Sequence, residues 1–309
     1  MNDIIRTVLG DITREDLGHT QCHEHIFIKR CKSTEISDVL LIDNLKNSTN
    51  ELELYKRVGG GTVVDAQPVM AGRMTEYLIA ASKVSGVNII ASTGFHKTVY
   101  YYNDSYIFNW NEEKIAQLYI EEITEGMEST KARAGLIKTA VDVKGIFADA
   151  VYEKLHTAAA EAQKQTNAPL MCHIEQSADA MEVVNFYLDR GVAPNRLWLA
   201  HLDRARYDFA YHDEILSRGV YLEYDTIARP KYHSDEDERR LILKMLDAGY
   251  ENQLLLGLDT TRERLKSYGA EIGLDYILKT FLPFLKAGGV TSEQCHKIVI
   301  ENPARALEI

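Results

Sequence analysis

The sequence predicts a TIM barrel of the α/β class, in which eight parallel strands alternate with helices around one closed sheet. Short segments rich in Val, Ile and Leu, a composition typical of strands buried on both faces, alternate with longer amphipathic segments. Eight such units fit into 309 residues. No linker rich in Ser or Pro divides the chain, so residues 1–309 are expected to form a single barrel domain.

The expected strands follow one another at regular intervals. Residues 1–20 are expected to form an N-terminal extension or hairpin, which leads into a first strand ending in Cys22-His23-Glu24-His25. Many of the joints before the later strands contain Gly or Pro, which interrupt helices. These later strands are expected at Thr62–Ala66, Asn88–Thr93, Gly135–Val141, Pro169–Ile174, Leu197–Leu202, Val220–Asp225 and Gln253–Asp259.

Amphipathic helices are expected between the strands. Apolar residues recur at spacings of three and four over 70–85, 111–131, 148–166 and 179–190. Ser234, followed by acidic residues, predicts the start of another helix. The alternation implies a parallel sheet with right-handed crossovers. The competing fold is a doubly wound open sheet, but that fold usually has a Gly-rich loop after its first strand, where this chain has His-Glu-His.

The charge balance narrows the possible partners. The chain has 35 Lys and Arg against 46 Asp and Glu, a net charge of −11, so a nucleic-acid or anionic-membrane partner is not expected. No apolar run is long enough to span a bilayer, and the first residues lack a signal-peptide core, which predicts a cytoplasmic protein. The four cysteines form no Cys-x-x-Cys pair and are expected to be free thiols.

Histidines occur where the expected strands end. His23 and His25 are two residues apart on one strand, so their side chains share a face while that of Glu24 points to the other. His173 ends the fifth strand, His201 the sixth and Asp259 the eighth. The carboxyl ends of barrel strands converge on one face. Four imidazoles and a carboxylate there suit Zn²⁺, Mn²⁺, Co²⁺ or Fe²⁺, so the sequence predicts a metal site.

Lys138 lies within the fourth expected strand, where an unpaired inward-facing cation would be costly. Two explanations are open. Either its side chain points outward, or its amine has reacted with CO₂ and become an anionic carbamate. A carbamate bridging two divalent ions would supply the negative charge that four neutral imidazoles and one aspartate lack.

Seven motifs spread along the chain resemble the phosphotriesterase-like branch of the amidohydrolase superfamily. The resemblance extends from Thr7 to Arg305 and implies a distorted TIM barrel with a binuclear metal centre at its carboxyl-terminal face. The motifs are 17–25 (LGHTQCHEH), 91–94 (ASTG), 135–138 (GLIK), 173–176 (HIEQ), 191–203 (ending AHLD), 258–262 (LDTTR) and 268–277 (YG…YI).

The resemblance also implies the role of each ligand. One metal would be held by His23, His25 and Asp259, and the other by His173 and His201. Carboxylated Lys138 and a hydroxide would bridge the two ions, with Zn as the expected metal and Mn or Co as options. Asp259 would take the proton of the nucleophile and pass it to the leaving group, so Asp259 and Lys138 are the expected catalytic residues.

Two departures from relatives bear on the substrate. Phosphotriesterases use an aspartate–histidine relay behind the metal; Asp203 fits the aspartate, but Thr226 stands at the histidine position, which argues against efficient organophosphate hydrolysis. Lactonases of the family often have a tyrosine two residues after Thr-Gly, where this chain has His96. His96 either contacts the substrate or is a surface histidine.

Cations and phenols gather in the loops after three of the strands. In a chain of charge −11, they suggest a small anionic substrate, because Arg and Lys bind phosphate and carboxylate groups. The alternative is that they are ordinary solvated loop residues. The expected substrate contacts are His96, Lys97, Tyr100, Arg229, Lys231 and Arg262; Tyr101, Tyr102, Tyr232 and Arg264 lie in the same loops.

The leading interpretation is a lactonase that opens a phosphorylated sugar (furanose) lactone, as some members of the family that this sequence resembles do. The alternatives are a phosphoesterase or organophosphate hydrolase, or an N-acyl homoserine lactonase, which needs an apolar acyl channel. A non-catalytic binding protein would lack metal ligands, whereas all six positions are filled. The family resemblance also makes a homodimer possible.

Overall fold

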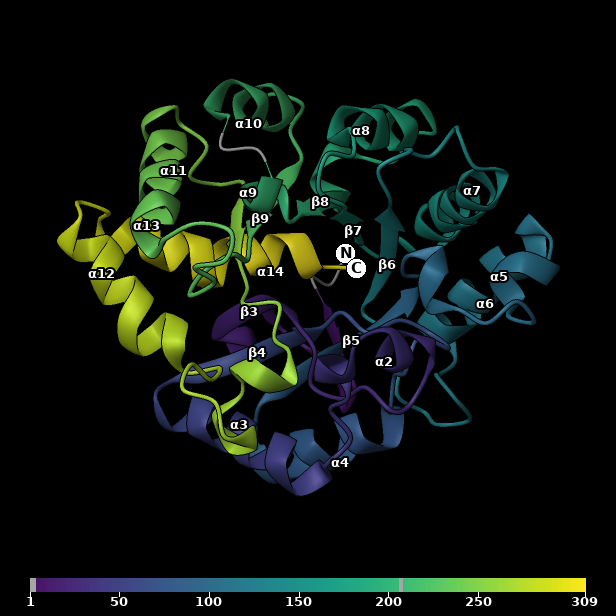
Figure 1. Ribbon diagram of the computed structural model, residues 1–309, viewed down its shortest axis with the longest axis horizontal. Coiled ribbons are helices and arrows are strands. Elements are labelled where there is room, and N and C mark those ends of the chain that lie inside the picture. The colour runs from purple at the N-terminus through teal and green to yellow at the C-terminus, as the bar shows by residue number, and fades with distance from the viewer. Residues whose placement is uncertain (1–3, 206–207) are drawn as a thin grey trace.

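Eight parallel strands form the core of the computed structural model, which describes residues 4–205 and 208–309 (Figure 1). Each strand pairs with the next one along the chain, in the order β3 to β10, so the predicted barrel is confirmed. The strands are β3 (His19–Glu24), β4 (Gly60–Asp65), β5 (Asn88–Gly94), β6 (Leu136–Val141), β7 (Leu170–Ile174), β8 (Leu197–Ala200), β9 (Tyr221–Tyr224) and β10 (Leu254–Leu256).

The barrel is distorted where its first and last strands meet. The described residues of β3 and β10 form no regular ladder there. Instead, the Asp259 backbone N–H donates to the His23 carbonyl at 2.9 Å, and the Leu258 N–H donates to the Glu24 carboxylate at 2.8 Å. The expected last strand therefore stops at Leu256, and the chain turns so that Asp259 adopts a left-handed φ of 46°.

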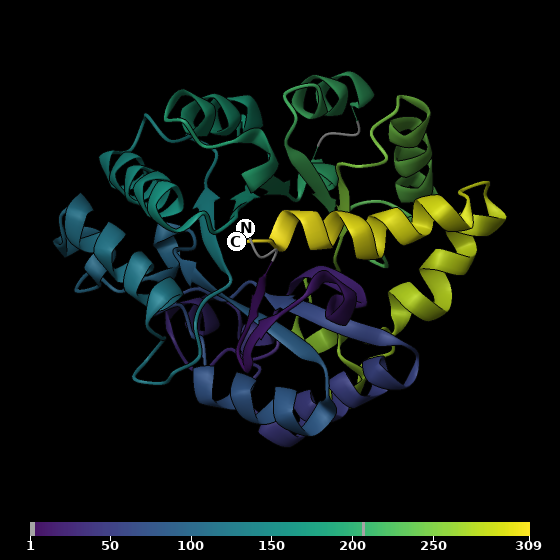
Figure 2. The same cartoon turned by 180° about the vertical axis from the view of Figure 1, so that it is seen from behind.

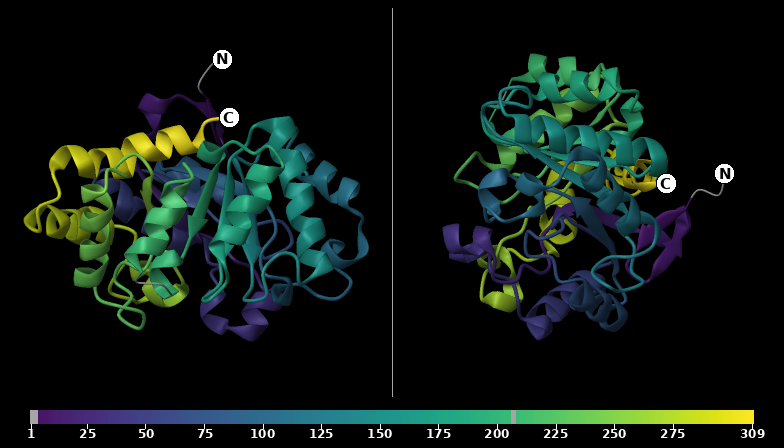
Figure 3. Two further views of the ribbon diagram at one scale, coloured as in Figure 1. Left: turned by 90° about the horizontal axis from the view of Figure 1, so that it is seen from above. Right: turned by 90° about the vertical axis from the view of Figure 1, so that its right-hand side faces the viewer.

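Helices surround the sheet (Figures 1 and 3). The predicted helices over 148–166 and 179–190 are confirmed almost in full, whereas those over 70–85 and 111–131 are shorter, beginning at Thr75 and ending at Thr124. The α-helices are α1 (Arg14–Leu17), α2 (Lys32–Ile36), α3 (Leu45–Arg57), α4 (Thr75–Ser85), α5 (Tyr106–Asn109), α6 (Glu112–Thr124), α7 (Ala150–Thr166), α8 (Ala180–Asp189), α9 (Leu202–Ala205), α10 (Phe209–Leu216), α11 (Asp235–Asp247), α12 (Leu282–Ala287), α13 (Ser292–His296) and α14 (Asn302–Leu307).

Helix starts follow the capping residues in the sequence. Ser234 caps α11 as predicted: its hydroxyl accepts from the Asp237 N–H at 3.2 Å, while the Asp237 carboxylate accepts from the Ser234 N–H. Asn111 and Asp179 cap α6 and α8 in a similar way. None of the helices in the described ranges is both long enough and apolar enough to cross a membrane.

The first and last described residues, Ile4 and Ile309, meet at the amino-terminal end of the barrel. The predicted N-terminal extension contains a hairpin of β1 (Ile5–Thr7) and β2 (Gly10–Ile12). The Ile309 N–H donates to the Ile4 carbonyl at 3.1 Å, and α14 runs across this end of the barrel toward the chain terminus (Figure 2). Ile5 and Leu307 are buried against the barrel interior and close this end.

One layer of apolar side chains fills the barrel, with a residue from every strand. Because side chains alternate along a strand, the residue two positions further on points into the next layer. That layer lies toward the carboxyl ends of the strands, and it receives Lys138, His173 and Glu223. The apolar layer consists of Cys22, Val64, Ile90, Leu136, Met171, Trp198, Tyr221 and Leu255.

Candidate metal centre and active site

A change of register in β3 brings two consecutive residues into the barrel. The pairing of β3 with β4 shifts between Gln21 and Glu24. Cys22 belongs to the apolar layer, yet the next residue, His23, also faces inward, with its Nε2 atom 3.1 Å from the Lys138 Nζ atom. Gly257 permits this arrangement, because a Cβ atom there would lie 2.9 Å from both the His23 N and Cβ atoms.

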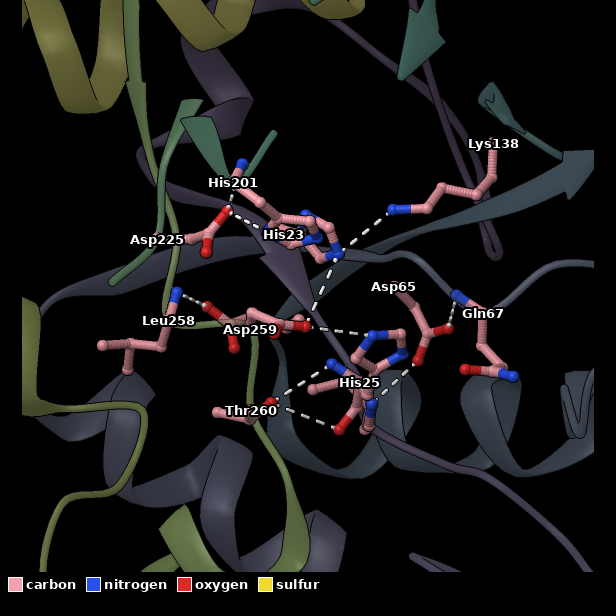
Figure 4. Close-up of polar contacts among 12 residues, drawn as sticks. His23, His25, Asp65, Gln67, Lys138, His201, Asp225, Leu258, Asp259 and Thr260 are labelled. Atoms are coloured by element: carbon pink, nitrogen blue, oxygen red, sulfur yellow. Dashed lines mark hydrogen bonds and ion pairs between the residues drawn. The ribbon is translucent and has the colours of Figure 1, made fainter. Parts of the chain in front are cut away.

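His23 and His25 both face Asp259, as their spacing predicts. The Asp259 Oδ1 atom lies 3.6 Å from the His23 Nε2 atom and 3.3 Å from the His25 Nε2 atom (Figure 4). The ligand atoms of these three side chains are close enough together to hold one metal ion. The three residues come from the two ends of the strand order, so the barrel has to close for the group to form.

His173 and His201 stand beside this group. Their ring centroids are 4.4 Å apart, and the His201 ring is 4.7 Å from that of His23. The His201 Nδ1 atom lies 2.6 Å from the Asp225 Oδ2 atom, so Nδ1 carries the proton and Nε2 presents its lone pair. His201 holds this position with a left-handed φ of 73°, a strained conformation that is common at functional sites.

Three of the histidines, His23, His173 and His201, are in the protonation state that metal binding requires. Burial lowers the pKa of His23 and His201 well below the ordinary value and lowers the pKa of His173 to about 4. These imidazoles are therefore neutral at pH 7, and neutral nitrogens and a carboxylate oxygen are the donors that zinc and similar ions prefer. The residues thus fit a pair of divalent ions.

Lys138 points into the barrel, so the outward alternative is wrong. The side chain is fully buried, and its Nζ atom lies 3.1 Å from both the His23 Nε2 and Met171 Sδ atoms. Burial lowers the pKa of Lys138 to about 8. A substantial fraction of the amine is therefore neutral near pH 8, and the neutral amine is the form that reacts with CO₂.

Two arginines hold the free oxygen of Asp259. The Arg204 Nη2 atom lies 2.5 Å from Asp259 Oδ2 and 2.5 Å from Asp225 Oδ1, and the Arg229 Nη1 atom lies 2.9 Å from Asp259 Oδ2. Burial alone would raise the pKa of Asp259, but the two guanidinium groups outweigh it and hold that pKa well below its usual range. Asp259 is therefore a carboxylate throughout the neutral pH range.

Sequence reasoning missed Arg204 and Glu223. The Glu223 Oε1 atom lies 3.2 Å from the His23 Nδ1 atom, on the side of the ring away from Asp259. A signal for Glu223 was present, since it precedes Asp225 by two residues in a buried strand and must share its face. Arg204 follows Asp203 in the short helix α9, and no strand pattern indicates where its side chain points.

A cavity of about 260 Å³ opens above these residues. His25, His173 and Asp259 form part of its floor. Five of the six expected substrate contacts line it together: His96, Lys97, Tyr100, Arg229 and Lys231. Arg262 does not line the cavity, since its Nη2 atom pairs with the Asp38 Oδ2 atom at 2.5 Å.

The other loop residues singled out in the sequence have different roles. Tyr101 is buried, with its hydroxyl receiving the His96 N–H at 3.1 Å, and the Tyr102 hydroxyl donates to the Glu35 carboxylate at 2.6 Å. Both therefore pack the loop, whereas Tyr232 lines the cavity. The Arg264 guanidinium donates to the Ile227 carbonyl at 2.8 Å.

An eight-stranded parallel barrel that gathers histidines, a lysine and an aspartate at the carboxyl ends of its strands defines a barrel metallohydrolase. A family model described as the phosphotriesterase family matches residues 3–307. The chain belongs to the phosphotriesterase family, as the motifs indicate, and is a hydrolase of that family. Enzymes of this family depend on a binuclear metal centre, and the residues described above include groups that could bind metal ions.

Several relatives are similar over more than nine-tenths of their length. A phospho-furanose lactonase of Mycoplasmopsis synoviae strain 53 is 32% identical over 326 residues, which cover 99% of this chain and 92% of the relative. The crystal structure of an amidohydrolase from Mycoplasma synoviae has a TM-score of 0.94 at 31% identity and covers 100% of this chain and 92% of its own. The lactonase Lmo2620 from Listeria monocytogenes has a TM-score of 0.92 at 28% identity and covers 98% of each chain.

Proposed function

We propose that this protein is a metal-dependent lactonase that opens the ring of a phosphorylated furanose lactone. The observation that carries the proposal is the cationic cavity above the ligand cluster, in which Lys97, Arg229 and Lys231 lie in a chain of net charge −11. Guanidinium and ammonium groups are the usual partners of a phosphate. The similarity to a phospho-furanose lactonase supports the same substrate class.

The proposed cofactor is a pair of divalent ions, with zinc favoured by the histidine and carboxylate donors. His23, His25 and Asp259 would hold one ion, and His173 and His201 the other. Lys138 would bridge them as a carbamate, formed when its neutral amine makes a bond to the carbon of CO₂ and loses a proton. When bound, the metals lower the pKa of a water molecule and polarise the carbonyl to be attacked.

Asp259 has the geometry to transfer the proton. Its Oδ1 atom faces His23 and His25, and its Oδ2 atom is held by Arg204 and Arg229. As the water oxygen attacks the lactone carbonyl carbon, the carboxylate accepts the water's proton. When the bond between that carbon and the ring oxygen breaks, the same proton passes to the leaving alkoxide. The product is the open-chain hydroxy acid.

The remaining cavity residues would orient the substrate. Lys231 and Arg229 follow β9 and Lys97 follows β5, so their charges approach the cavity from different loops. The Lys97 ammonium pairs with Glu175, which fixes the position of the cation near His173. The His96 ring lies 5.0 Å from the His173 ring and would contact the lactone ring or its hydroxyls.

The experiment compares matched furanose lactones with and without a 5-phosphate on the zinc-loaded enzyme. We expect a higher kcat/KM for the phosphorylated lactone. Lys231→Met should lower kcat/KM for the phosphorylated lactone by about 10- to 100-fold, because one charged contact to the phosphate is lost. It should change kcat/KM for the unphosphorylated lactone little. Lys231 is suited to this test because it lines the cavity without contacting Asp259.

Arg262→Met is the matched control, since Arg262 is an arginine of the same face that does not line the cavity. It should leave the preference for phosphate unchanged. Equal rates on both lactones, with faster hydrolysis of phosphotriesters or of N-acyl homoserine lactones, would refute the proposed substrate.

A further inference from the structure

The backbone of His96, just after β5, is held in one position by hydrogen bonds. β5 ends at Gly94, and the next residue, Phe95, is fully buried, with its backbone N–H donating to the Lys138 carbonyl at 2.9 Å. The His96 backbone N–H donates to the hydroxyl of the buried Tyr101 at 3.1 Å. The chain therefore enters the cavity wall at His96 along a fixed path.

The His96 ring is confined by two other rings. Its centroid lies 4.8 Å from that of Tyr100, in an edge-to-face arrangement, and 5.0 Å from that of His173. All three side chains line the cavity. Because packing locks a ring placed in this way, a hydrogen bond from it to a substrate has a defined direction.

A backbone hydrogen bond also fixes the tautomer of His96. The Lys97 backbone N–H donates to the His96 Nδ1 atom at 2.7 Å. Since Nδ1 accepts a hydrogen bond, it carries no proton, so the ring is neutral and its single N–H is at Nε2. His201 has the opposite tautomer, because Asp225 accepts the proton on its Nδ1 atom. The His96 Nε2 atom is therefore a donor, whereas the His201 Nε2 atom presents a lone pair.

The Nε2–H group of His96 is open to a bound molecule. Among the residues that the structure describes, none accepts a hydrogen bond from it, and it is not one of the enclosed polar atoms that lack a partner. The adjacent cation in the same loop is already engaged, since the Lys97 ammonium pairs with Glu175. The group that this side of the cavity offers to a neutral acceptor is therefore the His96 N–H.

The place of His96 relative to the proposed phosphate contact indicates which part of a lactone it meets. β5 and β9 are four strands apart in the eight-stranded order, so His96 and Lys231 reach the cavity from opposite sides of the barrel (Figure 1). In a five-membered lactone, the carbon that carries the phosphate arm lies opposite the bond between the carbonyl carbon and its neighbour. With the phosphate at Lys231 and the carbonyl above the metal ligands, the hydroxyl on that neighbouring carbon lies on the side of His96.

We propose that His96 donates its Nε2–H to the hydroxyl next to the lactone carbonyl and thereby selects lactones that carry this hydroxyl. The inference rests on the proposed lactonase function and deepens it, because it assigns the contact that separates the hydroxylated ring from its deoxy analogue. A site that hydrogen-bonds a substrate hydroxyl rejects the analogue without it, since the donor, covered by the substrate, is then left unpaired.

The test uses two furanose lactones that both carry a 5-phosphate and differ only in this hydroxyl, on the zinc-loaded enzyme. We expect the wild-type kcat/KM to be about 10- to 100-fold lower for the deoxy lactone. His96→Phe should lower kcat/KM for the hydroxylated lactone until the two values are similar. His96→Gln, whose amide N–H takes the position of the ring Nε2–H, should retain most of the difference.

The matched control is Tyr102→Phe, because the Tyr102 hydroxyl belongs to the same loop but donates to Glu35 outside the cavity. It should discriminate like the wild type. Nitrogen NMR spectra of the metal-free protein should show the His96 proton on Nε2, a readout that is independent of activity.

Three outcomes would overturn this inference while the proposed function stands: a His96 proton on Nδ1, equal wild-type kcat/KM values for the two lactones, or undiminished discrimination in His96→Phe. Hydrolysis of neither lactone by the wild type would refute the proposed function, and this inference with it.

Discussion

The Nδ1 atom of His201 lies 2.6 Å from the Oδ2 atom of Asp225. This contact fixes the tautomer of a ring whose backbone is itself strained, and it leaves one nitrogen to face the rings of His23 and His173. Asp225 is in turn held by Arg204. The orientation of His201 therefore depends on Asp225 and, through Asp225, on Arg204.

Replacing Asp225 by asparagine removes the charge that orients His201. We expect Asp225→Asn to weaken zinc binding by about 10- to 100-fold, the usual effect of losing an outer-shell carboxylate. Competition with a chromophoric chelator measures this affinity. Asp247→Asn, at an exposed position at the end of α11, is the control and should bind zinc like the wild type. Unchanged affinity in Asp225→Asn would show that the His201 orientation does not depend on this contact.

The close approach of Gly257 to His23 predicts a steric effect. A Cβ atom at position 257 would lie 2.9 Å from the His23 backbone nitrogen, which cannot move aside easily. We expect Gly257→Ala to lower the free energy of unfolding by about 1 to 3 kcal/mol and to weaken zinc binding. Gly288→Ala is the control, because its Cβ atom would meet only the flexible Arg239 side chain. Urea unfolding of both variants distinguishes the two cases.

Arg204 compensates the charge of the buried Asp225 carboxylate and of the partly buried Asp259 carboxylate, so its removal should matter most when no metal is bound. Arg204→Met leaves Asp225 and Asp259 without this partner, and we expect the metal-free protein to lose about 3 to 5 kcal/mol of stability. Zinc should then stabilise the variant by more than it stabilises the wild type. Thermal unfolding with and without zinc measures both effects. If Arg204→Met destabilises the zinc-free and the zinc-bound protein equally, Arg204 does not compensate the charge that zinc would otherwise neutralise.

His156 predicts a dependence of stability on pH. Its Nε2 atom donates to the Ala140 carbonyl and its Nδ1 atom accepts from the Tyr187 hydroxyl, so the folded state holds it neutral. Burial lowers its pKa to about 3, against an unfolded value of about 6.5. The unfolded chain therefore binds the extra proton between these values, and this contribution to stability is present above pH 6.5 and lost as the pH falls.

Between pH 7 and pH 4.5, protonation of His156 in the unfolded chain is expected to lower the free energy of unfolding by about 2 to 3 kcal/mol. His156→Gln should be less stable at pH 7 but should lose that much less on acidification. Urea unfolding of the metal-free proteins at the two pH values gives the comparison. His296→Gln, at an exposed position, should keep the wild-type dependence. If acidification lowers the stability of His156→Gln as much as that of the wild type, His156 is not the origin of the pH dependence.

The strands could be predicted because each is a short buried apolar segment between helices with recognisable caps, such as Ser234 before α11. The convergence of His23, His25 and Asp259 followed from strand ends and from alternation. Loop geometry could not be predicted in the same way. Arg262 and Arg229 look alike in the sequence, yet Arg262 turns to Asp38 and Arg229 to Asp259, because tertiary contacts decide where a loop side chain points.

The seam between β3 and β10 has a consequence for how the site is assembled. His25 and Thr260 are bonded across this seam although they are 235 positions apart in the sequence. During synthesis, the histidines of β3 therefore leave the ribosome long before their aspartate exists. A nascent chain therefore has only part of the proposed ligand set, and an ion bound between His23, His25 and Asp259 would link the first barrel strand to the last.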